Sequence, residues 1–249
     1  MLRTFLTKFK KEWEYLNWGR AVVVSLAKQC VPDEPNCSLR ILDVGSGTGT
    51  DLLNLHQAFY PREIELFGVE SHPPYAQLCR EKGIHVIPLN VEHEALPLDD
   101  RSMDLVVANQ IIEHTKDIFW IFSEISRVLK PGGIVIVGVP NLASLHNRAL
   151  LMVGKQPTSI ELLGPHVRGI TKGSFKNFIM SDGYFEFLRV RGSNFYPFPA
   201  VISKGLSRLF PTLSVSLFFC CRRTSKEGRF IDVLKSRFYE TEFFKGTTA

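Results

Sequence analysis

A glycine-rich turn follows a short apolar run near residue 45, where the chain reads Ile41-Leu42-Asp43-Val44-Gly45-Ser46-Gly47-Thr48-Gly49. Glycines in such a turn adopt positive φ and let a ligand approach the backbone, and the first amides of the following helix face that ligand. The spacing is G-x-G-x-G, whereas the dinucleotide fingerprint is G-x-G-x-x-G. Asp43 is unfavourable beside a pyrophosphate and suits a ligand that carries an ammonium group. The turn therefore predicts a ligand site of another kind.

Short apolar runs alternate with segments of helical spacing up to residue 140. Each run is partly β-branched and apolar on both faces, as in buried parallel strands. The alternation predicts an α/β fold with a doubly wound, mostly parallel sheet, and a ligand crevice at the carboxyl ends of its strands. The expected strands are Leu39–Val44, Ile64–Val69, Ile84–Pro88, Met103–Ala108 and Ile134–Val139, and the expected helices between them are 50–59, 74–81 and 118–129.

The second half of the chain has a different pattern. A short apolar helix after residue 141 leads into a loop from Gly154 to Gly169, and loops of this length are usually functional. A helix over 171–181 and two more strands, 184–190 and 213–221, complete a seven-stranded sheet. We expect an N-terminal helical segment over 1–38 with a helix over 4–30, a main domain over 39–222 with a lid near 154–170, and a polar tail over 223–249.

Glu70 ends the second apolar run, in the sequence Phe67-Gly68-Val69-Glu70. A carboxylate at this place can accept hydrogen bonds from both hydroxyls of a ribose. The alternative is an ordinary surface glutamate that follows a strand.

Composition limits the class of protein and its partners. The chain has 249 residues, of which 45% are hydrophobic and 22% charged, as in globular proteins. The net charge is +5, but the basic residues are scattered, so we expect no nucleic-acid partner. They are concentrated at two places, Arg3 to Lys11 and Arg222 to Arg229. These favour a solvated surface, and the alternative is attraction to an acidic substrate or a membrane surface.

Neither a membrane span nor an export signal is expected. The longest apolar run, Val215 to Cys221, is far shorter than the ~18 residues of a spanning helix, and no apolar segment follows the first basic residues. The cysteine count is odd and no C-x-x-C occurs, which predicts reduced thiols in a cytoplasmic protein. The five cysteines are Cys30, Cys37, Cys79, Cys220 and Cys221.

Taken together, these features resemble the class I S-adenosylmethionine-dependent methyltransferases. Asp43 to Gly49 is similar to the first motif of that family, and Glu70 to its acidic ribose ligand. The resemblance covers residues 39–140 and implies a Rossmann-like methyltransferase fold, S-adenosylmethionine as cofactor, and methyl transfer to a small-molecule acceptor, with oxygen as the expected target. Further similar segments are Asn90-Val91-Glu92 followed by Leu96-Pro97, Met103 to Val107, Glu113-His114 followed by Asp117, and Arg127 to Gly133.

The resemblance also implies roles for single residues. The glycines of the turn lie against the methionine and ribose parts of the cofactor, with Asp43 near its amino group. Asn109 and Gln110 face the methyl donor and the acceptor, and the alternative is that they cap the strand end. The implied cofactor-binding residues are Asp43, Gly45, Ser46, Gly47, Gly49, Glu70, Asn90, Val91, Asn109 and Gln110.

Transfer to a hydroxyl is assisted by a general base. The candidates are His114 and His166, and the alternatives are a helix cap for His114 and a loop hydrogen bond for His166. Arg168 would pair with an acidic group on the acceptor. We expect no metal site, because one Glu-His pair without further carboxylates is too small a donor set.

Two other functions are compatible with parts of the pattern. The first is a catalytically inactive binding or scaffold protein of the same fold, which partners another enzyme through its aromatic C-terminal half. The second is a nicotinamide dehydrogenase, which the turn spacing and the lack of a hydride-transfer constellation disfavour. The identity of the acceptor and the oligomeric state are not predicted, since substrate choice in this fold depends on loops.

Overall fold

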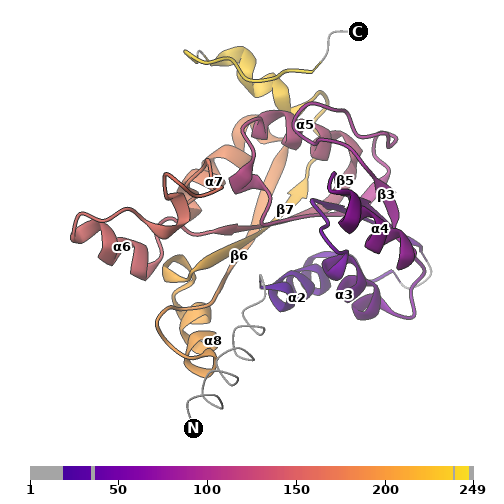
Figure 1. The fold of residues 1–249 in the computed structure, drawn as a ribbon. Helices are drawn as coiled ribbons and strands as arrows, with labels where there is room; N and C mark the ends of the chain where they lie inside the picture. The colour runs from indigo at the N-terminus through magenta and orange to yellow at the C-terminus, as the bar shows by residue number, and fades with distance from the viewer. Residues whose placement is uncertain (1–18, 35–36, 238, 247–249) are drawn as a thin grey trace.

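The computed structural model describes residues 19–34, 37–237 and 239–246, and its centre is one seven-stranded sheet (Figure 1). The strand order is β3-β2-β1-β4-β5-β7-β6. The first five strands of that order are parallel, and β7 is antiparallel to both of its neighbours. The predicted doubly wound, mostly parallel sheet is thereby confirmed. The strands are β1 (Leu39–Val44), β2 (Ile64–Val69), β3 (His85–Ile87), β4 (Met103–Asn109), β5 (Leu129–Pro140), β6 (Phe185–Ser193) and β7 (Ser216–Arg223).

β5 begins five residues earlier than the sequence predicts. Its partner on β4 shifts from the pair Met103–Leu129 to the pair Leu105–Ile134, so residues 130–133 form a bulge. Gly132 has a φ of 86° within this bulge, a conformation that glycine adopts without steric cost. The segment before the expected strand is therefore an irregular part of a longer strand.

Helices cover both faces of the sheet, which is why its strands are apolar on both sides. Alternate strand residues such as Ile41 and Leu42 point to opposite layers. One layer contains α2 (Arg20–Cys30), α3 (Thr50–Phe59) and α4 (Pro73–Glu81). The other contains α5 (Ile118–Val128), α7 (Lys172–Ile179) and the 3-10 helix η5 (Phe230–Ser236).

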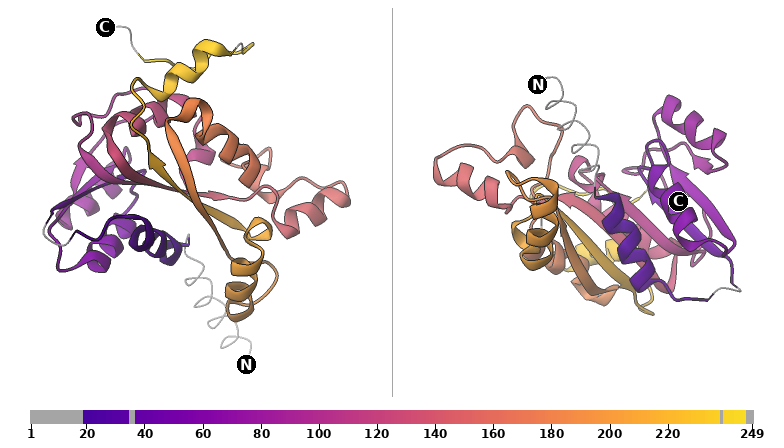
Figure 2. Two further views of the ribbon diagram at one scale, coloured as in Figure 1. Left: turned by 180° about the vertical axis from the view of Figure 1, so that it is seen from behind. Right: turned by 90° about the horizontal axis from the view of Figure 1, so that it is seen from below.

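Two further helices lie beyond the sheet, away from both layers (Figure 2). These are α6 (Leu145–Met152), after β5, and α8 (Ala200–Leu209), after β6. α8 lies in a segment for which the sequence pattern predicts no helix or strand. The short 3-10 helices are η1 (Ile112–His114), η2 (Thr158–Ile160), η3 (Ser181–Gly183) and η4 (Pro211–Leu213).

The two ends of the chain differ from the expectation in different ways. Of the helix expected over residues 4–30, residues 4–18 lie outside the described residues, and the described part begins at Arg20. The expectation of a polar tail is wrong for η5, because Phe230, Val233 and Leu234 are buried in the layer that contains α5. The C-terminal segment thus completes one side of the core.

Two sequence expectations concern thiols and membranes. Cys79, Cys220 and Cys221 are buried, and all five cysteines are free thiols. Within the described ranges, no helix has the length and apolar character that crossing a bilayer requires.

Candidate active site

The glycine-rich turn between β1 and α3 has three left-handed glycines, with φ of 76° at Gly45, 52° at Gly47 and 76° at Gly49. A Cβ on Gly45 would lie 3.0 Å from the Ile111 side chain, and one on Gly49 would lie 2.4 Å from Ile84. A Cβ on Gly47 would meet no atom within 4 Å. The middle of the turn therefore presents bare backbone to open space, which is the feature a backbone-bound ligand needs.

Glu70 lies at the open side of this turn, as the sequence predicts. One carboxylate oxygen accepts a hydrogen bond of 2.8 Å from the Gly47 amide. The other accepts one of 2.7 Å from the His72 amide, at the start of α4. The structure thus brings together the two residues, Gly47 and Glu70, that carry the prediction of a ribose-bearing ligand.

Asp43 is a buried acid behind the turn, with an exposed fraction of 2%. Burial raises the pKa of Asp43 well above its usual range, and the neighbouring carboxylate of Asp51 raises it further. Arg20 opposes both effects. A ligand ammonium group beside Asp43 would add a second cation to this acidic environment, so the site fits the amino group of S-adenosylmethionine.

Sequence reasoning missed Arg20 and Asp51, two charged residues that shift the pKa of Asp43. Arg20 Nε lies 3.3 Å from Asp51 Oδ1, and Asn109 Nδ2 donates to Asp51 Oδ2 at 2.9 Å. Burial raises the pKa of Asp51, while its hydrogen bond with Asn109 and the charge of Arg20 lower it. The sequence signal for Asp51 was its position as an acidic residue in the first turn of the helix that follows the glycines.

Asn109 is the last residue of β4, and Gln110 follows it. Asn109 is held by Asp51, and Gln110 has a left-handed backbone with a φ of 58°. The Gln110 side-chain nitrogen is buried and has no hydrogen-bond partner among the described residues. A buried donor of this kind is costly to leave unpaired, which is consistent with the predicted position facing a ligand.

Asn90 and Val91 lie in the loop after β3. The Asn90 side-chain oxygen accepts a hydrogen bond of 3.0 Å from the Glu92 backbone amide. The Asn90 backbone amide donates to the Glu94 carboxylate at 2.7 Å. Val91 packs against the core. These contacts stabilise the loop itself, and the implied contact of Asn90 and Val91 with the cofactor stays a prediction.

Glu113 and His114, which follow β4, form a cluster with His166, which lies near the end of the lid loop. One ligand-type atom from each lies within 4.8 Å of the others. The two imidazole rings are edge-to-face, with centroids 4.7 Å apart. The structure therefore brings the two predicted base candidates together, although 51 residues separate them in the sequence.

Backbone carbonyls orient both imidazoles. His114 Nδ1 lies 3.3 Å from the Pro165 carbonyl oxygen, and His166 Nδ1 lies 3.0 Å from that of Ser159. A carbonyl only accepts, so the neutral rings carry their proton on Nδ1 and keep the lone pair of Nε2. Burial lowers the pKa of His114, which favours this neutral form.

Glu113 is the member of the cluster that sequence reasoning left without a role. Its exposed fraction is 1%, and neither carboxylate oxygen has a hydrogen-bond partner among the described residues. Burial raises the pKa of Glu113 to about 7. The only signal was its neighbourhood, an acid directly after two isoleucines at a strand end.

The same donor set could hold one divalent metal ion, because carboxylate and imidazole are common ligands of Zn²⁺, Fe²⁺ and Mn²⁺. The loop supplies the third ligand atom, from His166, which the sequence did not place beside Glu113. The expectation of a metal-free site stays a prediction.

The lid loop is fastened to the segment after β4. The Val167 amide donates to the Glu113 carbonyl at 2.8 Å. The Arg168 guanidinium donates to the carbonyl oxygens of Thr115 and Lys116. Arg168 is therefore hydrogen-bonded to the backbone of the segment after β4. Its pairing with an acidic group on the acceptor stays a prediction.

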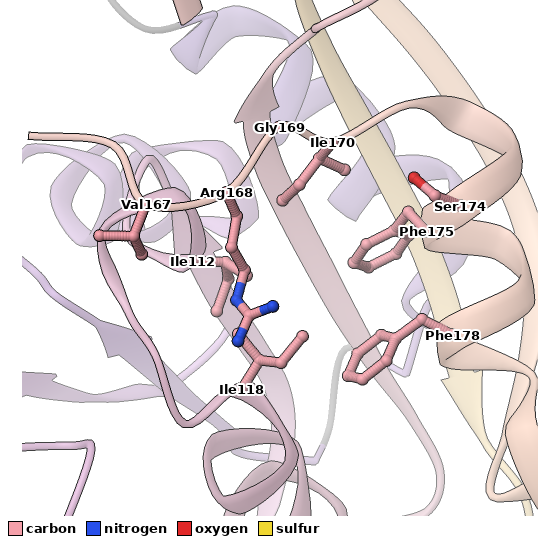
Figure 3. Close-up of a pocket in the computed structure, with 9 residues that line it drawn as sticks. All are labelled: Ile112, Ile118, Val167, Arg168, Gly169, Ile170, Ser174, Phe175 and Phe178. Atoms are coloured by element: carbon pink, nitrogen blue, oxygen red, sulfur yellow. The ribbon is translucent and has the colours of Figure 1, made fainter. Parts of the chain in front are cut away.

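A cavity of about 310 Å³ lies beside the cluster, between the lid loop, the start of α5 and α7 (Figure 3). Its lining is apolar apart from Ser174 and Arg168, whose guanidinium points between Ile112 and Ile118 in Figure 3. Ile112 follows Ile111, which packs against Gly45. The neighbouring residues Ile111 and Ile112 thus link the glycine turn to the lining of the cavity.

Comparisons with known proteins identify what the chain is similar to. Residues 42–137 match the methyltransferase domain family. The chain is 31% identical over 112 residues to malonyl-[acyl-carrier protein] O-methyltransferase 1 of Coxiella burnetii, covering 44% of this chain and 37% of the relative. It is 27% identical over 160 residues to the ubiquinone biosynthesis O-methyltransferase of Cereibacter sphaeroides, covering 62% of this chain and 60% of the relative.

A solved SAM-dependent methyltransferase from Thermotoga maritima has the same fold, with a TM-score of 0.59 and 20% identity, covering 88% of this chain and 96% of that one. The matched regions span between 31% and 60% of the length of the first curated relatives. The region that matches the family contains both the glycine turn and Glu70. Residues 42–137 therefore match a methyltransferase domain, and the chain has the fold of a solved SAM-dependent methyltransferase.

Proposed function

We propose that the protein transfers a methyl group from S-adenosylmethionine to an oxygen atom of a small-molecule acceptor. The observation that carries this proposal is the cluster of Glu113 and His114 with His166 of the lid loop. The first two follow Ile111, which packs against the glycine turn. Two relatives named O-methyltransferases support the choice of oxygen. The odd number of cysteines supports a cytoplasmic location.

The bound cofactor would supply an electrophilic methyl group on a sulfonium, and the chain supplies position and proton transfer. The Gly47 backbone and the Glu70 carboxylate would hold the ribose, and Asp43 the amino group. Gln110, with its unpaired side-chain nitrogen, would orient the acceptor. These contacts would hold the methyl donor and the acceptor beside each other, and such proximity contributes to the rate.

The histidines would accept the proton that an acceptor hydroxyl loses. Their Nε2 atoms keep a lone pair because each Nδ1 is bonded to a carbonyl. Once an imidazole is charged, the buried carboxylate of Glu113 stabilises it, because opposite charges attract strongly where water is excluded. General-base assistance of this kind contributes on the order of a hundredfold or more to a rate.

Incubation of the protein with a small-molecule cell extract and isotope-labelled S-adenosylmethionine tests the proposal. We expect mass spectrometry to show one labelled O-methyl product that is absent with Glu113→Gln, whose cofactor affinity stays normal. A labelled N- or C-methyl product would contradict the choice of oxygen. Full activity of Glu113→Gln would remove the cluster from the mechanism.

Treatment with EDTA distinguishes proton transfer from a metal-assisted reaction. Because we assign proton transfer to the imidazoles, we expect the chelated protein to keep its turnover. Loss of turnover that Zn²⁺ or Mn²⁺ restores would show instead that Glu113, His114 and His166 bind a metal ion.

A second function, an inactive scaffold of the same fold, makes a different prediction. A scaffold would bind the cofactor or its demethylated product, but added acceptor candidates would not change that affinity. We expect the acceptor found in the labelling experiment to bind more tightly in the presence of demethylated cofactor.

A further inference from the structure

α8 has an inverted distribution of polar and apolar side chains. It buries Ser203 and Ser207, whereas Val201 and Leu209 are 85% and 73% exposed. A helix packed on a protein surface normally turns its apolar side inward, because water contact with apolar side chains costs free energy. The outer side of α8 is therefore built for an environment other than water.

α6 shows the same inversion. It buries Asn147, whose side chain donates to Ser159 and to the Asn141 carbonyl. Its last residues, Leu151 and Met152, are exposed. Polar contacts thus hold the inner side of this helix, and leucine and methionine form the outer side.

The two helices emerge from the same end of the sheet. Pro140, the last residue of β5, and Ser193, the last residue of β6, both pair with Ser216. The rings of His146 on α6 and Tyr196 before α8 lie 5.6 Å apart. All three views show α6 and α8 on one side of the molecule (Figures 1 and 2).

The lid loop after α6 adds two more apolar side chains. Leu162 and Leu163 are 94% and 104% exposed. Among the described residues, thirteen of the seventeen exposed large hydrophobic side chains fall within 145–167 and 196–210. We call these two segments the docking edge.

The charge of the docking edge favours one kind of partner. Its basic residues are Arg148, Lys155, Lys204 and Arg208, and its single acidic residue is Glu161. A second copy of the chain would bring the same positive charge against itself. Basic residues between exposed apolar ones are typical of helices that lie in the interface of an anionic bilayer.

We propose that the docking edge binds the surface of a bilayer that contains anionic phospholipids. The apolar side chains of α6, the lid loop and α8 would enter the headgroup region, and the basic side chains would contact lipid phosphates. This association is peripheral.

Vesicle flotation with the full chain tests this proposal. We expect binding to vesicles of phosphatidylcholine mixed with phosphatidylglycerol, and little binding to phosphatidylcholine alone. Leu162→Gln with Leu163→Gln should weaken the partition about tenfold or more, because each leucine loses its burial. Lys155→Gln with Arg208→Gln should weaken binding to anionic vesicles about fivefold per charge.

Tyr60→Gln with Leu78→Gln is the matched control, because both side chains are exposed and lie outside the docking edge. We expect this variant to bind vesicles like the wild type, and all variants to keep their affinity for S-adenosylmethionine. Absence of binding to anionic vesicles, or equal loss in the control, would overturn the proposal. So would a dimer, measured by light scattering, that the double leucine variant abolishes, since a second copy would then cover the edge.

Discussion

Buried carboxylates dominate the chemistry of this protein at the scale of single residues. Asp43, Asp51 and Glu113 lie in surroundings that raise their pKa. Glu70 instead accepts hydrogen bonds from two backbone amides. The sequence predicted Asp43 and Glu70, since both directly neighbour strand ends. The two isoleucines before Glu113 did not indicate that its carboxylate would have no hydrogen-bond partner among the described residues. The burial of Glu113 depends on the path of the lid loop, which is more than forty residues away in the sequence.

Removal of the Glu70 carboxylate should weaken cofactor binding. Loss of hydrogen bonds from a charged group costs about 1.5–3 kcal/mol, so we expect Glu70→Ala to bind S-adenosylmethionine about ten- to a hundredfold more weakly in calorimetry. Glu81→Ala, on the exposed side of α4, is the control and should bind normally. Unchanged affinity of Glu70→Ala would remove this residue from the site.

Glu113 should make the stability of the protein depend on pH. Its pKa is about 7 in the folded protein and near 4.5 in the unfolded chain, so the folded state binds more protons between these values. The associated stability is complete below pH 4.5 and is lost as the pH rises through 7.

We therefore expect Glu113→Gln, which cannot ionise, to gain stability relative to the wild type as the pH rises. Between about pH 5 and about pH 8 the difference in the free energy of unfolding should change by about 2.5 kcal/mol. Urea titrations at the two pH values measure it, with exposed Glu161→Gln as control. A difference that does not vary with pH would show that Glu113 ionises normally.

At the scale of elements, the sequence predicted the strands and the helices between them, because apolar runs and helical spacing are local signals. It did not predict α8. A segment that exposes valine and leucine and buries serine contradicts the rule that apolar side chains face the core. The lid loop was predicted from its glycines and prolines, but not its contact with the segment after β4, because no local pattern specifies such a long-range contact.

His166 tests whether the lid loop takes part in the reaction. We expect His166→Ala to lower turnover about a hundredfold or more, with cofactor affinity unchanged, because the imidazole acts only when the acceptor is bound. Steady-state kinetics with the identified acceptor, together with calorimetry, separate the two quantities. His56→Ala, an exposed histidine on α3, should behave like the wild type. Wild-type turnover of His166→Ala would leave the loop with a structural role.

At the scale of the whole molecule, the C-terminal segment closes the layer that contains α5. The Phe230 ring contacts the rings of Phe119, Phe122 and Phe178. Composition alone suggested a polar tail, since charged residues surround the few aromatic ones there. Only the three-dimensional arrangement shows that η5 fills a gap between α5 and α7.

Phe230→Ala should therefore destabilise the protein strongly. Truncation of a buried phenylalanine costs about 3–5 kcal/mol, and Phe230 is 0% exposed. Chemical denaturation measures this loss, and Leu163→Ala, at a fully exposed position, should change stability by less than about 0.5 kcal/mol. A small effect of Phe230→Ala would mean that the segment is not part of the folded core.

The central claim is that S-adenosylmethionine binds on the bare backbone of the glycine turn. Calorimetry with Gly47→Val and Gly83→Val tests it most directly. Both glycines have positive φ, and a Cβ at either position would meet no neighbouring atom, so the two substitutions strain the backbone alike. We predict that Gly47→Val remains folded and loses measurable affinity for S-adenosylmethionine, whereas Gly83→Val binds it normally. Normal binding by Gly47→Val would contradict the account.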